Sequence, residues 1–231
     1  MRISKTLILG AVAAVATAGS ANAAVVSLFD FTTGVSSDST GSVTGSNPLS
    51  RWATNTDRKT STTSATGSGG AITMASASVV QSGGSPMAVL GVYADQSPNP
   101  PYNYYSSADL SGATAIEFNV TAYSGVATTW SLFVFDADGN LSFSQLAVSS
   151  AGTKSFSTAS MSTIDWSKVI GVELQAESGI LPPSPQRTPY NYYGTFSFTF
   201  DGMNAVGVVP APGAIALLGA AGLVGARRRR A

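Results

Sequence analysis

The sequence predicts an all-β fold, a two-layer antiparallel β-sandwich. From residue 71 onward, short segments rich in β-branched and aromatic residues recur between turn signals. Only 10% of the 231 residues are charged, while 44% are hydrophobic, which is ample for a core. No soluble helix is apparent between the two ends of the chain, so we expect two packed sheets.

Nine strands are expected. The clearest pattern is strict alternation in residues 195–200, where three phenylalanines share one face and Thr and Ser share the other. Ile116, Phe118 and Val120 alternate with polar residues in the same way. The expected strands are residues 25–31, 71–80, 87–93, 115–123, 130–135, 141–148, 154–157, 169–176 and 195–200.

Residues 32–70 lack this pattern. About half of them are Ser or Thr, with glycines interspersed and few apolar anchors. Such composition is typical of a long loop. We therefore expect a Ser/Thr-rich loop that covers one edge of the sandwich domain, which spans residues 24–204.

The first 23 residues have the order of a secretory signal peptide. Arg2 and Lys5 precede an apolar run over residues 7–18, and small residues follow at 20–23. We expect a signal helix that signal peptidase removes, with the mature chain beginning near Ala24.

The last segment, residues 205–231, combines an apolar stretch with a basic end. Residues 213–226 form a hydrophobic, helix-compatible stretch that is followed at once by four arginines. As a helix it spans about 21 Å, less than the roughly 30 Å of a hydrocarbon core. The arginines are expected to stay in the cytoplasm, so this helix holds the chain at the inner membrane until processing.

"VPAPGAIALLGAAGLVGARRRR" (residues 209–230) resembles the PEP-CTERM sorting signal. The resemblance implies recognition by an exosortase and delivery to the surface or extracellular matrix of polysaccharide-producing bacteria. Ala211 stands where that family has Glu, and the sequence leaves open whether the tail is cut. The residues that match the signal are Pro210, Pro212, Arg227, Arg228, Arg229 and Arg230.

Charge and missing residue types exclude several functions. Removal of the two basic residues of the signal and the four of the tail leaves six basic residues against twelve acidic ones, a net charge near −6. Such a domain repels nucleic acid. The chain has no Cys and no His, which excludes thiol nucleophiles, Ser-His-Asp triads and Cys/His zinc sites.

One catalytic alternative stays open. Glycosidases work through two carboxylates, and Glu117 and Glu173 are the best pair because each stands among apolar neighbours in an expected strand. Exposed strand positions usually hold solvated charges, so we expect no enzyme.

A candidate metal site lies between two strands, at Asp136, Asp138 and Asn140. Asp-Gly supplies the backbone angles of a tight hairpin turn, and this is the favoured interpretation. The alternative is a calcium site, because the three residues place oxygen ligands at alternate positions. Apart from calcium, no cofactor is expected. Asp165 is expected to cap a separate turn that ends at Lys168.

Part of the domain resembles jelly-roll carbohydrate-binding and galactose-binding-like modules. The matching stretches are "DLSGATAIEFNVTA" (109–122), "SLFVFDADGN" (131–140), "SFSTASMSTIDWSKVIGVELQ" (155–175) and "FSFTFDGM" (196–203). The resemblance implies a jelly-roll topology, with sugar binding as one function that such modules perform.

The pentapeptide PYNYY occurs twice, each time after a proline cluster, so both copies are expected in loops. If the loops share one end of the sandwich, their rings could stack on sugars in a common groove. The favoured alternative is that they plug that end and bind nothing. The six tyrosines are Tyr102, Tyr104, Tyr105, Tyr190, Tyr192 and Tyr193.

Together these features predict an exported, surface-sorted and non-enzymatic structural protein associated with extracellular polysaccharide. A weak glycan-binding module is the first alternative and a carboxylate glycosidase the second.

Overall fold

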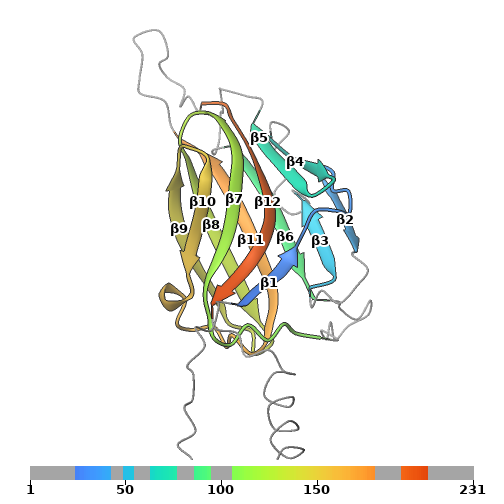
Figure 1. The fold of residues 1–231 in the computed structure, drawn as a ribbon, viewed down its shortest axis with the longest axis vertical. Helices are drawn as coiled ribbons and strands as arrows, with labels where there is room; N and C mark the ends of the chain where they lie inside the picture. The colour runs from blue at the N-terminus through green and yellow to red at the C-terminus, as the bar shows by residue number, and fades with distance from the viewer. Residues whose placement is uncertain are drawn as a thin grey trace, which may run out of the picture.

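A computed structural model describes residues 24–42, 49–54, 63–76, 86–94, 106–179 and 194–207. Within these residues the chain forms two antiparallel sheets of six strands each, stacked face to face (Figure 1). The two-layer β-sandwich predicted from the sequence is therefore confirmed.

The first sheet has the order β10-β7-β12-β5-β4, and β1 also pairs with β12. The long strand β12 pairs along one side with β7, while β5 and β1 share its other side at successive positions. The strands of this sheet are β1 (Ala24–Phe29), β4 (Thr63–Ser68), β5 (Ala71–Ser76), β7 (Ala113–Gly125), β10 (Gly152–Ser157) and β12 (Phe196–Gly207).

The second sheet has the order β2-β3-β6-β11-β8-β9, so β11 lies at its centre between β6 and β8. Its strands are β2 (Ser39–Ser42), β3 (Arg51–Thr54), β6 (Met87–Tyr93), β8 (Thr128–Asp136), β9 (Leu141–Val148) and β11 (Val169–Ser178).

Aromatic side chains fill the space between the sheets. Trp130 of β8 is fully buried and contacts Phe118 of β7 edge-on at 5.7 Å between ring centroids. The same indole lies 4.5 Å from Phe198 and 5.9 Å from Phe200, both on β12. The edge-to-face contact with Phe118 adds stabilisation beyond the buried area itself. The Trp130 indole of the second sheet thus packs against three aromatic rings of the first sheet.

All nine expected strands are present, and Leu141–Val148 and Met87–Tyr93 have the predicted bounds. The prediction of one long loop over residues 32–70 is wrong in part, because strands β2, β3 and β4 lie within that range. These strands are short and Ser/Thr-rich, yet they alternate: Trp52, Thr54 and Ala65 are buried while their neighbours are less so. Pairing with β6 and β5, rather than intrinsic apolar content, makes them strands.

The signal at 1–23 and the tail from 208 onward lie outside the described residues. Residues 205–207, expected as the start of the tail, form the end of β12 and pair with β1 and β7. Within the described ranges the chain has one short 3-10 helix, Thr158–Ser160. No helix in that part of the chain has the length and apolar character needed to cross a membrane.

Candidate functional site

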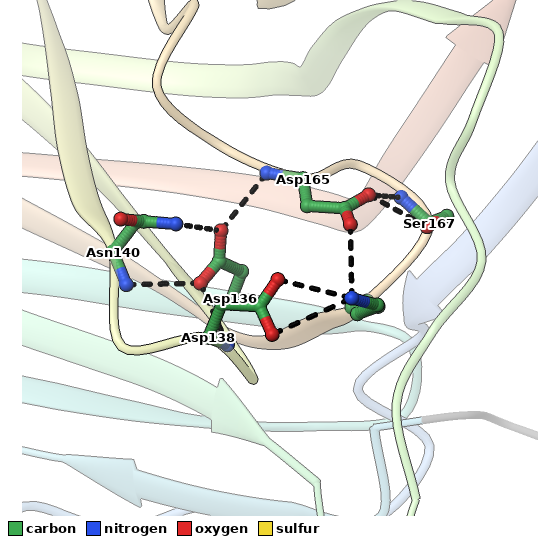
Figure 2. A network of polar contacts seen from close by, with 6 residues as sticks. Asp136, Asp138, Asn140, Asp165 and Ser167 are labelled. Carbon is green, nitrogen blue, oxygen red and sulfur yellow. Dashed lines mark hydrogen bonds and ion pairs between the residues drawn. The ribbon is translucent and has the colours of Figure 1, made fainter.

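The hairpin that joins β8 to β9 is built around one buried carboxylate. Asp136 ends β8 and is only 1% exposed. Its Oδ1 accepts hydrogen bonds from the backbone N–H groups of Asp138 (3.0 Å) and Asn140 (2.9 Å). Its Oδ2 accepts from the Asn140 side-chain amide and the backbone N–H of Asp165, both at 2.9 Å (Figure 2). Both oxygens therefore have two donors each.

The hairpin is tied to the turn that precedes β11. Lys168 donates to Asp138 at 3.0 Å and lies 3.3 Å from Asp165. Asp165 in turn accepts from the backbone N–H of Ser167 at 3.0 Å and from its hydroxyl at 2.6 Å (Figure 2). The predicted cap by Asp165 is confirmed, whereas its contact with the hairpin joins residues too far apart in the sequence to be predicted.

The hydrogen bonds of this network shift the pKa values of Asp136, Asp165 and Lys168. Burial by itself raises the pKa of Asp136, but the hydrogen bonds from Asp165, Asn140 and Asp138 outweigh it, so the pKa lies below 3.8. The pKa of Asp165 is also lowered, chiefly by the Ser167 hydroxyl. The pKa of Lys168 is raised by its hydrogen bonds to Asp138 and Asp165. All of these groups are held in their charged forms at neutral pH.

This geometry matches the hairpin interpretation of Asp136, Asp138 and Asn140. Gly139 adopts a positive φ of 86°, as the Asp-Gly pair predicted. Asn140 turns its NH₂ group, rather than its oxygen, toward Asp136, and the Asp138 carboxylate faces the ammonium group of Lys168. The described residues include no group of three or more His, Cys, Asp or Glu side chains able to hold a metal ion. The donors and the lysine thus already engage the oxygens that calcium would need.

The six tyrosines of the repeated pentapeptide lie outside the described residues, but the anchors of both loops are described. The first loop leaves at Ala94 and returns at Ala108, which pair with Ile170 and Val169 at the start of β11. The second leaves at Gly179, just after β11 ends, and returns at Gly194, which donates to Gly179. The two pairs of anchors are about 30 Å apart along β11. The described anchors of the two loops thus lie at opposite ends of β11, and the common groove of tyrosines stays a prediction.

The structure does not bring the two candidate catalytic glutamates together. Glu117 lies on β7 between the buried Ile116 and Phe118, and Glu173 lies on β11 between the buried Val172 and Leu174. Because the buried neighbours of each face the shared core, each carboxylate points away from it. The core and both sheets therefore separate the pair.

Sequence reasoning missed a polar cluster around Glu173, hereafter the Tyr93 cluster (Tyr93, Glu173 and Gln175). The Tyr93 hydroxyl donates to Glu173 Oε2 at 2.6 Å, and the Gln175 amide donates to Glu173 Oε1. The three residues come from two neighbouring strands, β6 and β11. Period-two alternation placed Glu173 and Gln175 on one face, but the strand order that adds Tyr93 is not readable from the sequence.

Two glycines let the Tyr93 ring lie flat on the sheet. A Cβ atom at Gly91 would lie 2.2 Å from the Tyr93 hydroxyl oxygen, and one at Gly171 would lie 2.7 Å from its Cδ1 atom. Gly171 is the cross-strand partner of Tyr93. Any larger residue at either position would lift the ring away from Glu173.

The outer faces of the two sheets differ in chemistry. On the second sheet, Tyr93 lies 6.4 Å from Phe135, and Phe133 stacks on Phe143 at 5.3 Å. On the first sheet, Thr73 and Thr199 share a hydroxyl contact of 2.8 Å. These outward-facing aromatic rings thus lie on the second sheet, beside the Tyr93 cluster.

No protein-family model matches the chain, and no curated protein matches it. Among solved structures, the chain is similar to an agarase, AgWH50C, with 12% identity and a TM-score of 0.45, over 78% of this chain and 24% of that one. It is also similar to an exo-beta-agarase, with 10% identity and a TM-score of 0.38, over 82% of this chain and 23% of that one. The chain spans about a quarter of the length of these two proteins, and likeness at such TM-scores carries no argument about function.

Proposed function

We propose that the chain is an exported, non-enzymatic structural protein of the cell surface or extracellular matrix, sorted by an exosortase and associated with exopolysaccharide. The geometric observation behind the non-enzymatic part is the separation of Glu117 and Glu173 on opposite outer faces. Carboxylate glycosidases need carboxyl groups about 5 to 10 Å apart.

Export and sorting are supported by the order of segments along the chain. A basic, apolar and small-residue leader precedes the domain, and two prolines, an apolar stretch and four arginines follow it. The domain between them has no Cys or His and few charges, which suits a passive surface component. The jelly-roll topology implied by the sequence resemblance is part of this proposal.

The sorting proposal is tested by replacing Arg227, Arg228, Arg229 and Arg230 with Gln. Loss of the positive charges removes the cytoplasmic stop, so we expect less protein on the cell surface and more unprocessed chain in membranes. Replacing Arg51 and Arg58 in the domain is the matched control and should leave surface display unchanged. Equal surface display of the tail variant and the wild type would overturn the proposal.

A weak glycan-binding module is the second candidate, and the Tyr93 cluster favours it. A carboxylate and an amide lie beside an aromatic ring there, a combination that can hydrogen-bond sugar hydroxyls and contact the apolar face of a sugar. The loop with Tyr102, Tyr104 and Tyr105 leaves the sheet directly after this cluster.

This candidate is tested by retention on the producer's own polysaccharide. Glu173→Ala and a Tyr102→Ala, Tyr190→Ala variant should each be retained less than the wild type, while both keep the wild-type circular dichroism. Glu117→Ala, on the opposite sheet, is the matched control and should be retained normally. Unchanged retention of the first two variants would remove glycan binding and leave the structural proposal in place.

A further inference from the structure

The free edges of the two sheets differ in how they are protected against pairing with another strand. An exposed edge strand presents unpaired backbone groups, and proteins protect it by shortness, bulges, inward charges or a covering segment. Among the described residues, β2 is four residues long and β1 carries a bulge between Ser27 and Phe29. On β4, Gly67 pairs with Val35 of a preceding segment. On β10, Lys154 shares the inward side with the buried Phe156.

Within the described ranges, the edge strand β9 has none of these devices. Its sequence, LSFSQLAV, contains no charge, no Pro and no Gly over eight residues. It pairs regularly with β8 from Leu141 to Val148, without a bulge. Its other side has no partner strand in the described part of the chain.

The outer face of β9 is also apolar. Leu141 is 54% exposed and Phe143 is 53% exposed. Among the described residues, the one other large hydrophobic side chain with such exposure is Val25 at 62%. Phe143 also stacks on the ring of Phe133, its cross-strand partner on β8.

We propose that β9 is a self-association edge, at which two copies of this chain pair antiparallel and join their second sheets into one continuous sheet. A second copy is favoured over another ligand because the backbone N–H and C=O groups on the free side of β9 are best paired by another β-strand. The β9 strand of a second copy is neutral, regular and self-complementary. Two identical uncharged strands meet with no like-charge repulsion, and closed two-fold pairing leaves no free β9 edge.

Symmetry restricts the register of this pairing. A two-fold axis perpendicular to the sheet keeps both outer faces on one side, so each residue must face a residue of the same parity. Pairing centred on Ser144 uses residues 141–147 and sets Ser144 opposite its own copy. Phe143 then lies opposite Gln145, and the two Phe143 rings are diagonal neighbours within contact distance.

The first test is sedimentation velocity of the purified full-length chain over roughly a hundredfold range of concentration. We expect a dimer that dissociates on dilution. Phe143→Lys should raise the dissociation constant at least about tenfold. Val25→Lys, an equally exposed position on the bulged β1, should leave it unchanged. Circular dichroism confirms that both variants are folded.

The second test uses the absence of cysteine. In the proposed register a single Ser144→Cys forms an intermolecular disulfide under mild oxidation, because directly opposed Cα atoms of an antiparallel pair lie about 4.5 to 5.5 Å apart, a separation that a disulfide spans. Ser155→Cys on the protected strand β10 is the control and should remain monomeric on a non-reducing gel. A wild-type chain that is monomeric at every concentration, or a dimer that Phe143→Lys does not weaken, would overturn the proposal without affecting the sorting proposal.

Discussion

Asp136 is the residue on which the β8–β9 hairpin depends. Replacing it with Ala leaves four donors without their acceptor: the backbone N–H groups of Asp138 and Asn140 and the Asn140 amide in the hairpin, and the backbone N–H of Asp165 in the turn before β11. Unsatisfied buried donors are costly, so Asp136→Ala should lower the free energy of unfolding by about 3 kcal/mol.

Chemical denaturation with urea measures this change. Asp138→Ala is the matched control, because the Asp138 side chain is 52% exposed and its partner Lys168 is 47% exposed. We expect the control to unfold close to the wild type. Equal destabilisation by both substitutions would show that the network around Asp136 does not hold the hairpin.

Four aspartates make the fold sensitive to acid. The pKa values of Asp30, Asp109, Asp136 and Asp165 all lie below 3.8 in the folded chain. A carboxylate whose folded pKa is lowered stabilises the fold above its unfolded pKa, and that contribution is lost as pH falls through the folded pKa. Stability should therefore decrease as pH falls below about 4.

Urea unfolding at a series of pH values between neutrality and about 3 tests this expectation. Asp136→Asn removes one of the four groups, so its stability should depend less steeply on pH than that of the wild type. A wild-type unfolding midpoint that stays constant down to pH 3 would contradict the pKa directions.

Three of these aspartates share a local motif that the sequence displays. Asp30, Asp109 and Asp165 are each followed two positions later by Ser or Thr, whose backbone N–H and hydroxyl both donate to the carboxylate. Such turns can be predicted from an Asp followed two positions later by Ser or Thr. Of the three, the turn at Asp165 is the one that the sequence analysis predicts. The link from Asp136 to the Asp165 N–H joins residues far apart in the sequence and was not readable.

At the scale of elements, Gly67 fixes the position of β4. It exchanges backbone hydrogen bonds with Val35 at 2.8 and 3.0 Å, which ties the segment after β1 to the sheet edge. A Cβ atom at Gly67 would lie 2.3 Å from the Ala71 oxygen and 2.6 Å from Ile72 Cα. Gly67→Ala must therefore move backbone and should destabilise the fold by about 1 to 3 kcal/mol.

Thermal and urea unfolding of Gly67→Ala beside Thr66→Ala checks this prediction. Thr66 is the exposed neighbour on the same strand, and its substitution should change stability by less than about 0.5 kcal/mol. If the two variants unfold alike, the close approach of Gly67 to the start of β5 is not a constraint.

Strands with strong alternation were predicted from the sequence, and those without it were not. The pattern of Phe196, Phe198 and Phe200 stood out because one face is buried and the other is polar. In β2 and β4 the side chains are mostly Ser, Thr and Gly, so pairing with neighbours supplies what composition does not. Strand order, and with it the Tyr93 cluster and the free β9 edge, depends on contacts distant in the sequence.

At the scale of the whole molecule, the proposed function draws on the described domain and on the two ends in different ways. The domain is a two-sheet sandwich with a packed aromatic core and a second sheet whose outer face and β9 edge are suited to contacts. The sequence at the two ends supports export and sorting. A passive surface protein needs both a stable domain and a route out of the cell.

Intact mass spectrometry of the protein recovered from the cell-surface fraction tests the proposed route most directly. The expected species begins near Ala24 and lacks the arginine tail, so its mass is well below the 23.4 kDa of the whole chain. Recovery of the unprocessed chain from the cytosol, with none at the surface, would contradict it.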